Sequence, residues 1–472
     1  MTDMSSALTP SRSRRPWLLT AILAAALLLR LGLVFGVRDI GIHTDDERDY
    51  VKLAQSLEAD QRFGYDSGST SMRPPLYPAF VALTWAAAGA QSLTAVRLAQ
   101  TALSLASIVL VFLLGRRLFT PTAGLWAAAL WAFYPSFLYA NVLVLTEVLF
   151  TCLLLAACLC AVAAASAPER AGWWALGVGL AVGLAALTRS VLWPFPIVLA
   201  PALAWVTAGS WRQRGFAALG VLVGYLAVVA PWAIRNTSLQ QTFVVVDTMG
   251  GLNLRMGNYE YTIEDRMWDG VSLTGDKAWS HEMVLEHPEA SQWTEGQRDR
   301  WARQRATDYM LSHPWTTVRR SALKFADFWG LEREYIAALQ AGKYPVPGWF
   351  QAVSSVAVLG AYVVLMVMAC FGLFLAPWPQ WRRHVVPLLA VVWVCAIHSI
   401  VFGHSRYHLP VMPILLVYSA AALSGLSWRW TAVVGWRRTA VACALLALVC
   451  IWGREVLVRD ADRIRHFMTA QL

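Results

Sequence analysis

The sequence has few charged residues for its length, and this scarcity excludes an ordinary soluble protein. Only 14% of the 472 residues are Asp, Glu, Lys or Arg, whereas 57% are hydrophobic. The mean hydropathy is +0.49, and long apolar runs recur from Trp17 to Trp452. This composition is typical of a helical protein that crosses a membrane several times.

The sequence also lacks cysteine pairs in polar loops, a nucleotide-binding glycine loop and a sustained internal repeat. All seven cysteines sit inside apolar segments, so neither disulfides nor a cysteine metal site is expected. The net charge of +10 arises from small arginine clusters between the apolar runs. Such clusters are typical of loops that set membrane orientation, so no nucleic-acid partner is predicted.

The apolar runs predict an all-α integral membrane protein, a polytopic bundle of about eleven transmembrane helices. We expect these helices at residues 17–37, 92–114, 122–141, 144–165, 172–188, 190–208, 215–234, 351–376, 385–403, 409–427 and 438–453. With eleven spans, the following arginines share one side, which the positive-inside rule makes cytoplasmic: Arg12, Arg14, Arg15, Arg116, Arg117, Arg170, Arg212, Arg214, Arg382, Arg383, Arg429, Arg437 and Arg438. The tail arginines from Arg454 to Arg465 fall on the opposite side, against this rule.

The same rule decides an ambiguous segment, Pro75 to Ala90, which is apolar but would reverse every later loop if it crossed the membrane. We therefore expect it to be an external interfacial helix. The predicted organisation is an N-terminal transmembrane catalytic module (1–235) with a first external loop (38–91), a large external region (236–349) and C-terminal transmembrane helices (350–472). The external region is hydrophilic and includes the amphipathic stretch "SHPWTTVRRSALKFADFWG", which we expect to lie on the membrane.

The polar residues that are unusual beside a membrane all fall at the outer ends of helices or in outer loops. They are Asp45, Asp46, Glu47, Arg73, Glu147, Arg189, Arg235, Asn236, His404, Arg406, Tyr407 and His408. Singly, each has an ordinary explanation: a solvated loop for "DDERDY", a membrane anchor for Arg189 or Arg406, and a helix N-cap for Glu147 with Thr146. Their convergence on one face instead indicates a functional site.

Arg73 precedes two prolines in "RPPLYP", which prevent a helix from starting before it and allow one to start after Pro75. Its guanidinium would then lie at a helix N-terminus near the lipid headgroups, a favourable place for a phosphate. Enzymes that transfer a sugar from a lipid phosphate need such a cation for the departing phosphate, and a carboxylate base for the acceptor.

Seven motifs in order carry a resemblance to a known family: "DDERDY", "RPPLYP", "LTEVLF", "GLAALTRS", "VVAPWAIRN", "GGLNLRMGN" and "SRYHLPVMP". The chain resembles the glycosyltransferase family 39 group of membrane glycosyltransferases, which have the GT-C fold. This group includes the protein O-mannosyltransferases and resembles the bacterial aminoarabinose transferase that acts on lipid A.

The resemblance implies roles for particular residues. The Asp-Glu pair and the following tyrosine of the family align with Asp46, Glu47 and Tyr50, which makes Asp46 the expected base, with Asp45 as its nearest substitute and Glu47 as a further catalytic candidate. Arg73 would contact the polyprenyl phosphate, and Glu147 falls where relatives have a second essential acidic residue. We add Arg189, Arg235 and Arg406 as further phosphate-binding candidates. Substrate contacts are expected from Tyr50, Tyr77, Asn236, Asn253, Asn258, Tyr407 and His408.

The expected function is inverting transfer of a hexosyl or pentosyl group from a polyprenyl-phosphate donor to a lipid, glycan or protein. The site would face outward from the cytoplasmic membrane, which we expect to be that of a bacterium. No nucleotide or redox cofactor is implied; some relatives use a divalent metal, but His404 and His408 are more typical of polar contacts than of metal ligands. The alternatives are a transporter or flippase of lipid-linked saccharides, in which the same charges would line a path, and a polysaccharide polymerase or ligase.

Overall fold

The computed structural model describes residues 16–36, 41–264, 266–344, 346–378, 380–425 and 435–459. Within these residues the chain is mainly helical, as expected, and seven helices are long and apolar enough to cross a membrane. They are α1 (Pro16–Gly36), α4 (Leu93–Leu118), α7 (Glu147–Ser166), α10 (Trp211–Gln240), α16 (Gly348–Leu375), α17 (Arg382–Ile400) and α19 (Gly435–Arg454). The expectation of a multi-pass membrane protein is confirmed.

The other expected spans form shorter helices that are interrupted near prolines. They are α5 (Pro121–Ala132), α6 (Pro135–Val142), α8 (Ala171–Ala186), α9 (Pro196–Val206) and α18 (Met412–Leu423), with short 3-10 turns η2 (Ser190–Leu192) and η6 (Ser405–Val411) before the last two. A helix of 12 residues is only about 18 Å long, shorter than a hydrocarbon core of about 30 Å. The count of about eleven spans therefore stays a prediction.

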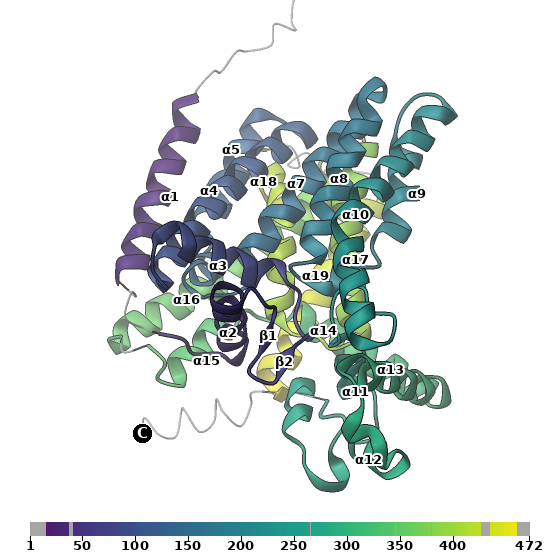
Figure 1. Ribbon diagram of the computed structural model, residues 1–472. Coiled ribbons are helices and arrows are strands. Elements are labelled where there is room, and N and C mark those ends of the chain that lie inside the picture. Colours follow the sequence, from purple (N-terminus) through teal and green to yellow (C-terminus); the bar gives the residue numbers. More distant parts are fainter. Residues whose placement is uncertain are drawn as a thin grey trace, which may run out of the picture.

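The polar parts of the chain gather at one end of the bundle, the lower end in Figure 1, opposite the N-terminal end of α1. The first external loop contributes α2 (Asp45–Asp60), a hairpin of β1 (Gly64–Tyr65) and β2 (Gly68–Ser69), and α3 (Leu76–Ala88). The region 236–349 contributes α11 (Gly250–Gly257), α12 (His281–Glu286), α13 (Glu295–Ser312), α14 (Pro314–Phe328) and α15 (Glu334–Gln340), with short 3-10 turns η3 (Met267–Ser272), η4 (Gly275–Lys277) and η5 (Pro288–Gln292). A further 3-10 turn, η1 (Pro168–Arg170), joins α7 to α8.

The membrane bundle packs closely where glycines line its helices. A Cβ atom on Gly179 of α8 would lie 2.2 Å from the carbonyl oxygen of Val221 in α10, and one on Gly372 of α16 would lie 1.8 Å from that of Tyr418 in α18. Small residues let membrane helices approach backbone to backbone, so these glycines determine which helices are neighbours.

A buried arginine holds α1 against this bundle. The Nε of Arg30 donates to Ser104 Oγ at 2.8 Å, and its Nη1 donates at 2.9 Å to the carbonyl oxygen of Ala132, the last residue of α5. The final carbonyls of a helix have no partners within the helix, so a cation is favourable there. Arg30 thus satisfies the end of a helix that stops inside the bundle.

The arginines of the C-terminal segment, expected on the external side against the positive-inside rule, have acidic partners in the structure. Asp327 at the end of α14 pairs with Arg454 at 3.0 Å and with Arg459 at 3.3 Å. In the π-helical turn η8 (Glu455–Arg459), Glu455 pairs with Arg333. Asp327 therefore offsets part of the positive charge of this segment. Arg12, Arg14, Arg15, Arg429, Arg463 and Arg465 lie outside the described residues.

The α3 helix is predicted not to cross the membrane. It has 13 residues, a length of about 20 Å, which is too short for the hydrocarbon core. In a cysteine-free background, we expect Ala90→Cys to react with a membrane-impermeant maleimide from the same side as Ser291→Cys. Thr122→Cys, beyond α4, should react only from the other side. Labelling of Ala90→Cys and Thr122→Cys from a common side would contradict this topology.

Candidate active site

The helix α2 begins at the "DDERDY" motif because its first turn is capped. The Thr44 hydroxyl accepts a hydrogen bond from the Glu47 backbone N–H, and Glu47 Oε2 accepts from the backbone N–H groups of Thr44 and His43, all at 3.0–3.1 Å. Its other oxygen, Oε1, accepts from the Val144 N–H at 3.0 Å, so Glu47 joins α2 to the loop before α7. This buried environment favours a structural role for Glu47 over the catalytic role expected from the sequence.

The two aspartates before Glu47 point in different directions. The side chain of Asp45 is 94% exposed and pairs only locally with Arg48, at 2.7 Å. Asp46 instead directs its carboxylate at two arginines from distant parts of the chain: Oδ1 lies 2.9 Å from Arg73 Nη2, and Oδ2 lies 3.5 Å from Arg406 Nη1. The Asp46 side chain remains 35% exposed, so a substrate can reach it.

Arg73 lies where the two prolines were expected to place it, directly before α3, which begins at Leu76. Its guanidinium also binds Asp49, with Nη2 at 2.8 Å and Nε at 3.2 Å from Oδ2, and its Cζ lies 5.8 Å from the centre of the Tyr50 ring. Asp49 was not among the site residues expected from the sequence. Its spacing of three residues from Asp46 in a helix was a usable signal, because residues i and i+3 share a face.

Glu147 is the first residue of α7, and its carboxylate is almost fully buried. Oε1 accepts from Arg406 Nε at 2.7 Å and from Arg189 Nη1 at 3.1 Å, whereas Oε2 has no hydrogen-bond partner among the described residues. The preceding Thr146 makes no side-chain cap bond. The geometry therefore favours a charge-pairing role for Glu147 over helix capping.

These contacts link six side chains into one chain of alternating charge. It runs in the order Asp49, Arg73, Asp46, Arg406, Glu147 and Arg189. The members come from α2, the turn before α3, the start of α7, the residue before η2 and η6 itself. Three basic and three acidic groups balance, so an anion that binds the arginines has to compete with carboxylates already present.

Arg235 and Asn236 were expected at the donor phosphate and the substrate, but the structure gives them internal partners. Arg235 Nη1 donates to the carbonyl oxygen of Thr70 at 2.6 Å, and its guanidinium lies 4.6 Å from the Trp232 ring centre. Asn236 is buried, accepts from the Ser71 hydroxyl at 2.9 Å and donates to the Val246 carbonyl oxygen at 2.9 Å. Both residues hold the turn that precedes Arg73, which favours a supporting role.

Three of the expected substrate contacts are likewise engaged inside the protein. The Tyr77 hydroxyl donates to Gln100 Oε1 at 2.7 Å. Asn258 accepts from Lys324 Nζ and donates to the carbonyl oxygen of Ile400. His408 is fully buried, with its ring nitrogens 2.6 Å from the Phe328 carbonyl oxygen and 2.9 Å from Glu332. These partners favour structural roles.

The remaining expected contacts are Tyr50, Tyr407 and Asn253. Tyr50 packs against Tyr77 and beneath Arg73, and Tyr407 lies under Arg189, whose Cζ is 5.6 Å from its ring centre. Both rings therefore border the charged chain. Asn253 lies in α11. No described group of three or more His, Cys, Asp or Glu side chains could hold a metal ion.

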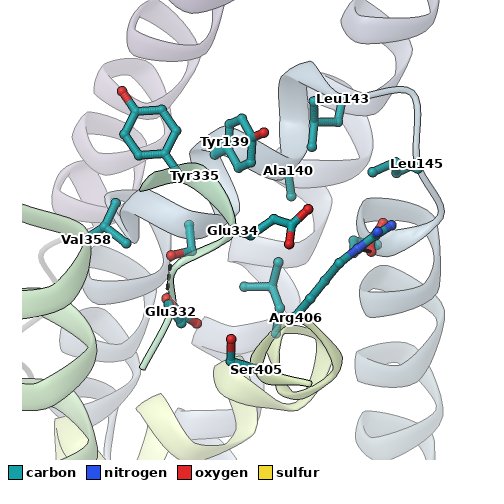
Figure 2. A pocket seen from close by; sticks show the side chains of 13 residues that line it. Tyr139, Ala140, Leu143, Leu145, Glu332, Glu334, Tyr335, Val358, Ser405 and Arg406 are labelled. Carbon is teal, nitrogen blue, oxygen red and sulfur yellow. Dashed lines mark hydrogen bonds and ion pairs between the residues drawn. The ribbon is translucent and has the colours of Figure 1, made fainter. Parts of the chain in front are cut away.

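A pocket adjoins the charged chain on the side of Glu147 and Arg406 (Figure 2). Its wall is mainly apolar and aromatic, with Leu143, Leu145 and Val358 among the lining residues. Tyr139 and Tyr335 also line it, their ring centres 5.1 Å apart. The lining residues Glu332 and Glu334 come from the end of the external region and were not expected from the sequence.

Asp247, also missed, is a further carboxylate near Arg73. Burial raises its pKa to about 6, while hydrogen bonds from Ser190 and from the backbone of Met249 and the charge of Arg73 oppose this rise. Perturbed carboxylates cluster at functional sites, so Asp247 belongs among the candidates.

Comparison with known proteins supports the expected resemblance. The sequence model of the dolichyl-phosphate-mannose-protein mannosyltransferase family matches residues 72–234, which include Arg73, Glu147 and Arg189. An undecaprenyl phosphate-alpha-4-amino-4-deoxy-L-arabinose arabinosyl transferase from Pseudomonas paraeruginosa is 31% identical over 223 residues. That alignment covers 44% of this chain and 39% of the relative. The matched part therefore spans well under half of the relative's length.

Two solved structures resemble the whole bundle. ArnT from Cupriavidus metallidurans, crystallised with undecaprenyl phosphate, has a TM-score of 0.53 at 16% identity, covering 92% of this chain and 65% of that one. The chain has the GT-C fold. The apo oligosaccharyltransferase from Archaeoglobus fulgidus is also similar, with a TM-score of 0.51 at 15% identity, covering 92% of this chain and 55% of that one. The GT-C architecture expected from the sequence motifs is thus confirmed.

Proposed function

We propose that this protein is a membrane glycosyltransferase that moves a sugar from a polyprenyl-phosphate carrier to an acceptor. The observation that carries this proposal is the partly exposed carboxylate of Asp46 between the two arginines Arg73 and Arg406. The GT-C fold and the partial similarity to a transferase named for an undecaprenyl-phosphate donor support it.

In the proposed reaction, Arg73 and Arg406 hold the donor phosphate, and Glu147, which also pairs with Arg189, holds Arg406 in place. The acceptor's hydroxyl or amine attacks the anomeric carbon, the bond from that carbon to the phosphate oxygen breaks, and Asp46 takes the acceptor's proton. The phosphate leaves with the bonding electrons, and its charge is stabilised by the guanidiniums. A single displacement of this kind inverts the anomeric configuration.

Donor binding would also prepare the base. Both oxygens of Asp46 pair with arginines, one at 2.9 Å and the other at 3.5 Å. A phosphate that draws Arg73 and Arg406 toward itself releases these oxygens. Asp46 would therefore be free to take a proton only when the donor phosphate is bound. This order would suppress proton removal from an acceptor in the absence of the donor.

The pocket beside Arg406 is proposed to take the part of the donor next to its phosphate, because its wall is mainly apolar and because Glu147 and Arg406 of the charged chain line it (Figure 2). The catalytic module would comprise residues 1–235, with the external region 236–349 and the helices of 350–472 closing the site. We further propose that the site faces outward from a bacterial cytoplasmic membrane, with the arginine-rich end of the bundle inside. In that end, Arg383 donates to the carbonyl oxygen of Arg117.

The function can be tested in two steps. Mass spectrometry of envelope lipids, glycans and glycoproteins from a strain that lacks the gene should reveal one missing sugar modification. The purified protein should then transfer that sugar from its polyprenyl-phosphate donor. A purified protein that consumes no such donor, while the deletion strain accumulates lipid-linked saccharide on the inner side, would instead support a flippase.

Arg73→Ala is predicted to raise the KM for the donor by about tenfold, as expected for the loss of one charge-assisted contact. Arg73→Lys should retain part of the affinity, because an ammonium replaces the charge but not the forked geometry. Initial rates over a range of donor concentrations measure both effects. An alanine variant with unchanged donor kinetics would remove Arg73 from the phosphate site.

A further inference from the structure

We propose that Glu295, in the external region, is a positioning residue for Arg73, so that the external region completes the phosphate site. This inference rests on the proposed function in one respect, namely that Arg73 binds a phosphate. It assigns a task to a residue 222 positions away from Arg73 in the sequence, and no sequence motif pointed to it.

The Glu295 carboxylate holds the turn that leads into Arg73. Oε1 accepts from the Thr70 hydroxyl at 2.6 Å, and Oε2 accepts from the Ser71 backbone N–H at 2.8 Å. The same Thr70 hydroxyl oxygen accepts from the Met72 backbone N–H at 3.0 Å. One carboxylate at the start of α13 therefore fixes three consecutive residues that end directly before Arg73.

The opposite side of this turn is held by α10. Asn236 accepts from the Ser71 hydroxyl, and Arg235 donates to the Thr70 carbonyl oxygen. The backbone N–H of Thr248 donates to the Ser71 carbonyl oxygen at 3.0 Å. The loop that leads into α11 therefore contacts a third side of this turn. The turn thus has partners on α10, on α13 and at Thr248. Among the described residues, Glu295 is the hydrogen-bond acceptor of the Ser71 backbone N–H.

The location of Arg73 makes this turn important for function. Downstream, the backbone is fixed by the Leu76 N–H, which donates to the Leu187 carbonyl oxygen at 2.9 Å. Upstream, no regular helix or strand lies between β2, which ends at Ser69, and Arg73. Without Glu295, the buried Ser71 N–H and Thr70 hydroxyl lose their acceptor, and the turn can shift the guanidinium away from Asp46 and Asp49.

Asp299 provides a matched control on the same helix. It lies four residues after Glu295 in α13, and its Oδ1 also accepts from backbone N–H groups, those of Gly251 at 2.6 Å and Leu252 at 3.2 Å. Asp299 therefore anchors the start of α11 in the way that Glu295 anchors the turn before Arg73. Loss of either carboxylate weakens the external region, but only Glu295 should affect Arg73.

The first experiment is hydrogen exchange on the full-length protein in detergent, which requires no donor. In Glu295→Ala, peptides containing residues 70–73 should exchange about tenfold faster than in the wild type. In Asp299→Ala, the acceleration should appear around residues 250–253 and not at 70–73. Unchanged protection of residues 70–73 in Glu295→Ala would overturn the positioning role, whatever the protein binds.

The second experiment is a double-mutant cycle with a short-chain polyprenyl phosphate as the probe, its affinity measured by titration. Glu295→Ala should weaken binding about tenfold in the wild-type background, but by less than about twofold when Arg73 is already alanine. Equal losses in both backgrounds, or no loss in either, would overturn the inference. If the wild type bound the phosphate no better than the matching polyprenyl alcohol, the proposed function would fail, while hydrogen exchange would still decide the role of Glu295.

Discussion

Asp46→Asn should lower the rate of sugar transfer by about 10²- to 10⁴-fold, the usual effect of losing a general base, without weakening donor binding. The amide keeps the shape of the side chain but cannot take the acceptor's proton. It also removes an anion that competes for Arg73 and Arg406, at 2.9 and 3.5 Å. Donor affinity should therefore be unchanged or higher, while the rate at saturating donor falls.

The neighbouring aspartates allow this effect to be separated from a change at Arg73. Asp49→Asn removes an equally close partner of Arg73, at 2.8 Å, but leaves the proposed base intact, so its effect should fall mainly on donor affinity. Asp45→Asn should have a much smaller effect than Asp46→Asn, because the Asp45 side chain is 94% exposed and pairs only with Arg48. Near-normal turnover by Asp46→Asn with a purified donor would exclude Asp46 as the base.

The sequence could predict which residues gather at the site because charge is unfavourable near hydrocarbon. A carboxylate or guanidinium at the end of an apolar helix needs a partner or water. The predicted orientation of the helices places five such residues at one end of the bundle: Asp46, Arg73, Glu147, Arg189 and Arg406. In the structure, these five form a continuous chain of ion pairs. Side assignment requires only hydropathy and arginine counts, which a single sequence contains.

The roles of individual polar residues could not be predicted in the same way, because they depend on which atoms meet in three dimensions. Glu47 follows Asp46 directly, yet its oxygens are used by the capping of α2 and by Val144. Asn236 and Glu295 hold the same serine, Ser71, although 59 residues separate them in the sequence. No local pattern distinguishes a carboxylate that holds a loop from one that contacts a substrate.

Helix lengths were also beyond the sequence analysis, because hydropathy does not reveal where a helix is interrupted. The apolar run expected as one span at 122–141 is divided into α5 and α6 after Ala132. Pro135 favours extended backbone at the preceding Tyr134, whose ψ is 114°, and starts a new helix at its own position. The carbonyl left at the end of α5 is satisfied by Arg30, a residue of α1 that hydropathy would treat only as an interruption.

Glu147→Gln is expected to lower both the thermal stability and the transfer rate, the latter by about 100-fold. The carboxylate is buried and its Oε1 serves both Arg406 and Arg189, so the neutral amide removes the counter-charge of Arg189 and leaves Arg406 with Asp46 alone. Breaking a buried ion pair from one side commonly costs about 3–5 kcal/mol. Arg406 would then be drawn further toward Asp46, which lies at 3.5 Å, and both the phosphate and the base would be affected.

Two variants separate charge pairing from helix capping in this prediction. Glu147→Asp keeps the charge on a shorter side chain, so it should recover part of the stability and part of the rate. Thr146→Ala changes the N-cap position of α7, where the side chain makes no cap bond, and should melt within about 2 °C of the wild type. Melting curves in detergent and initial rates with the lipid-linked donor give both readouts. If Thr146→Ala were as destabilising as Glu147→Gln, or if Glu147→Asp were no better than Glu147→Gln, the ion pairs of Glu147 would not be what holds Arg406 and Arg189 in the site.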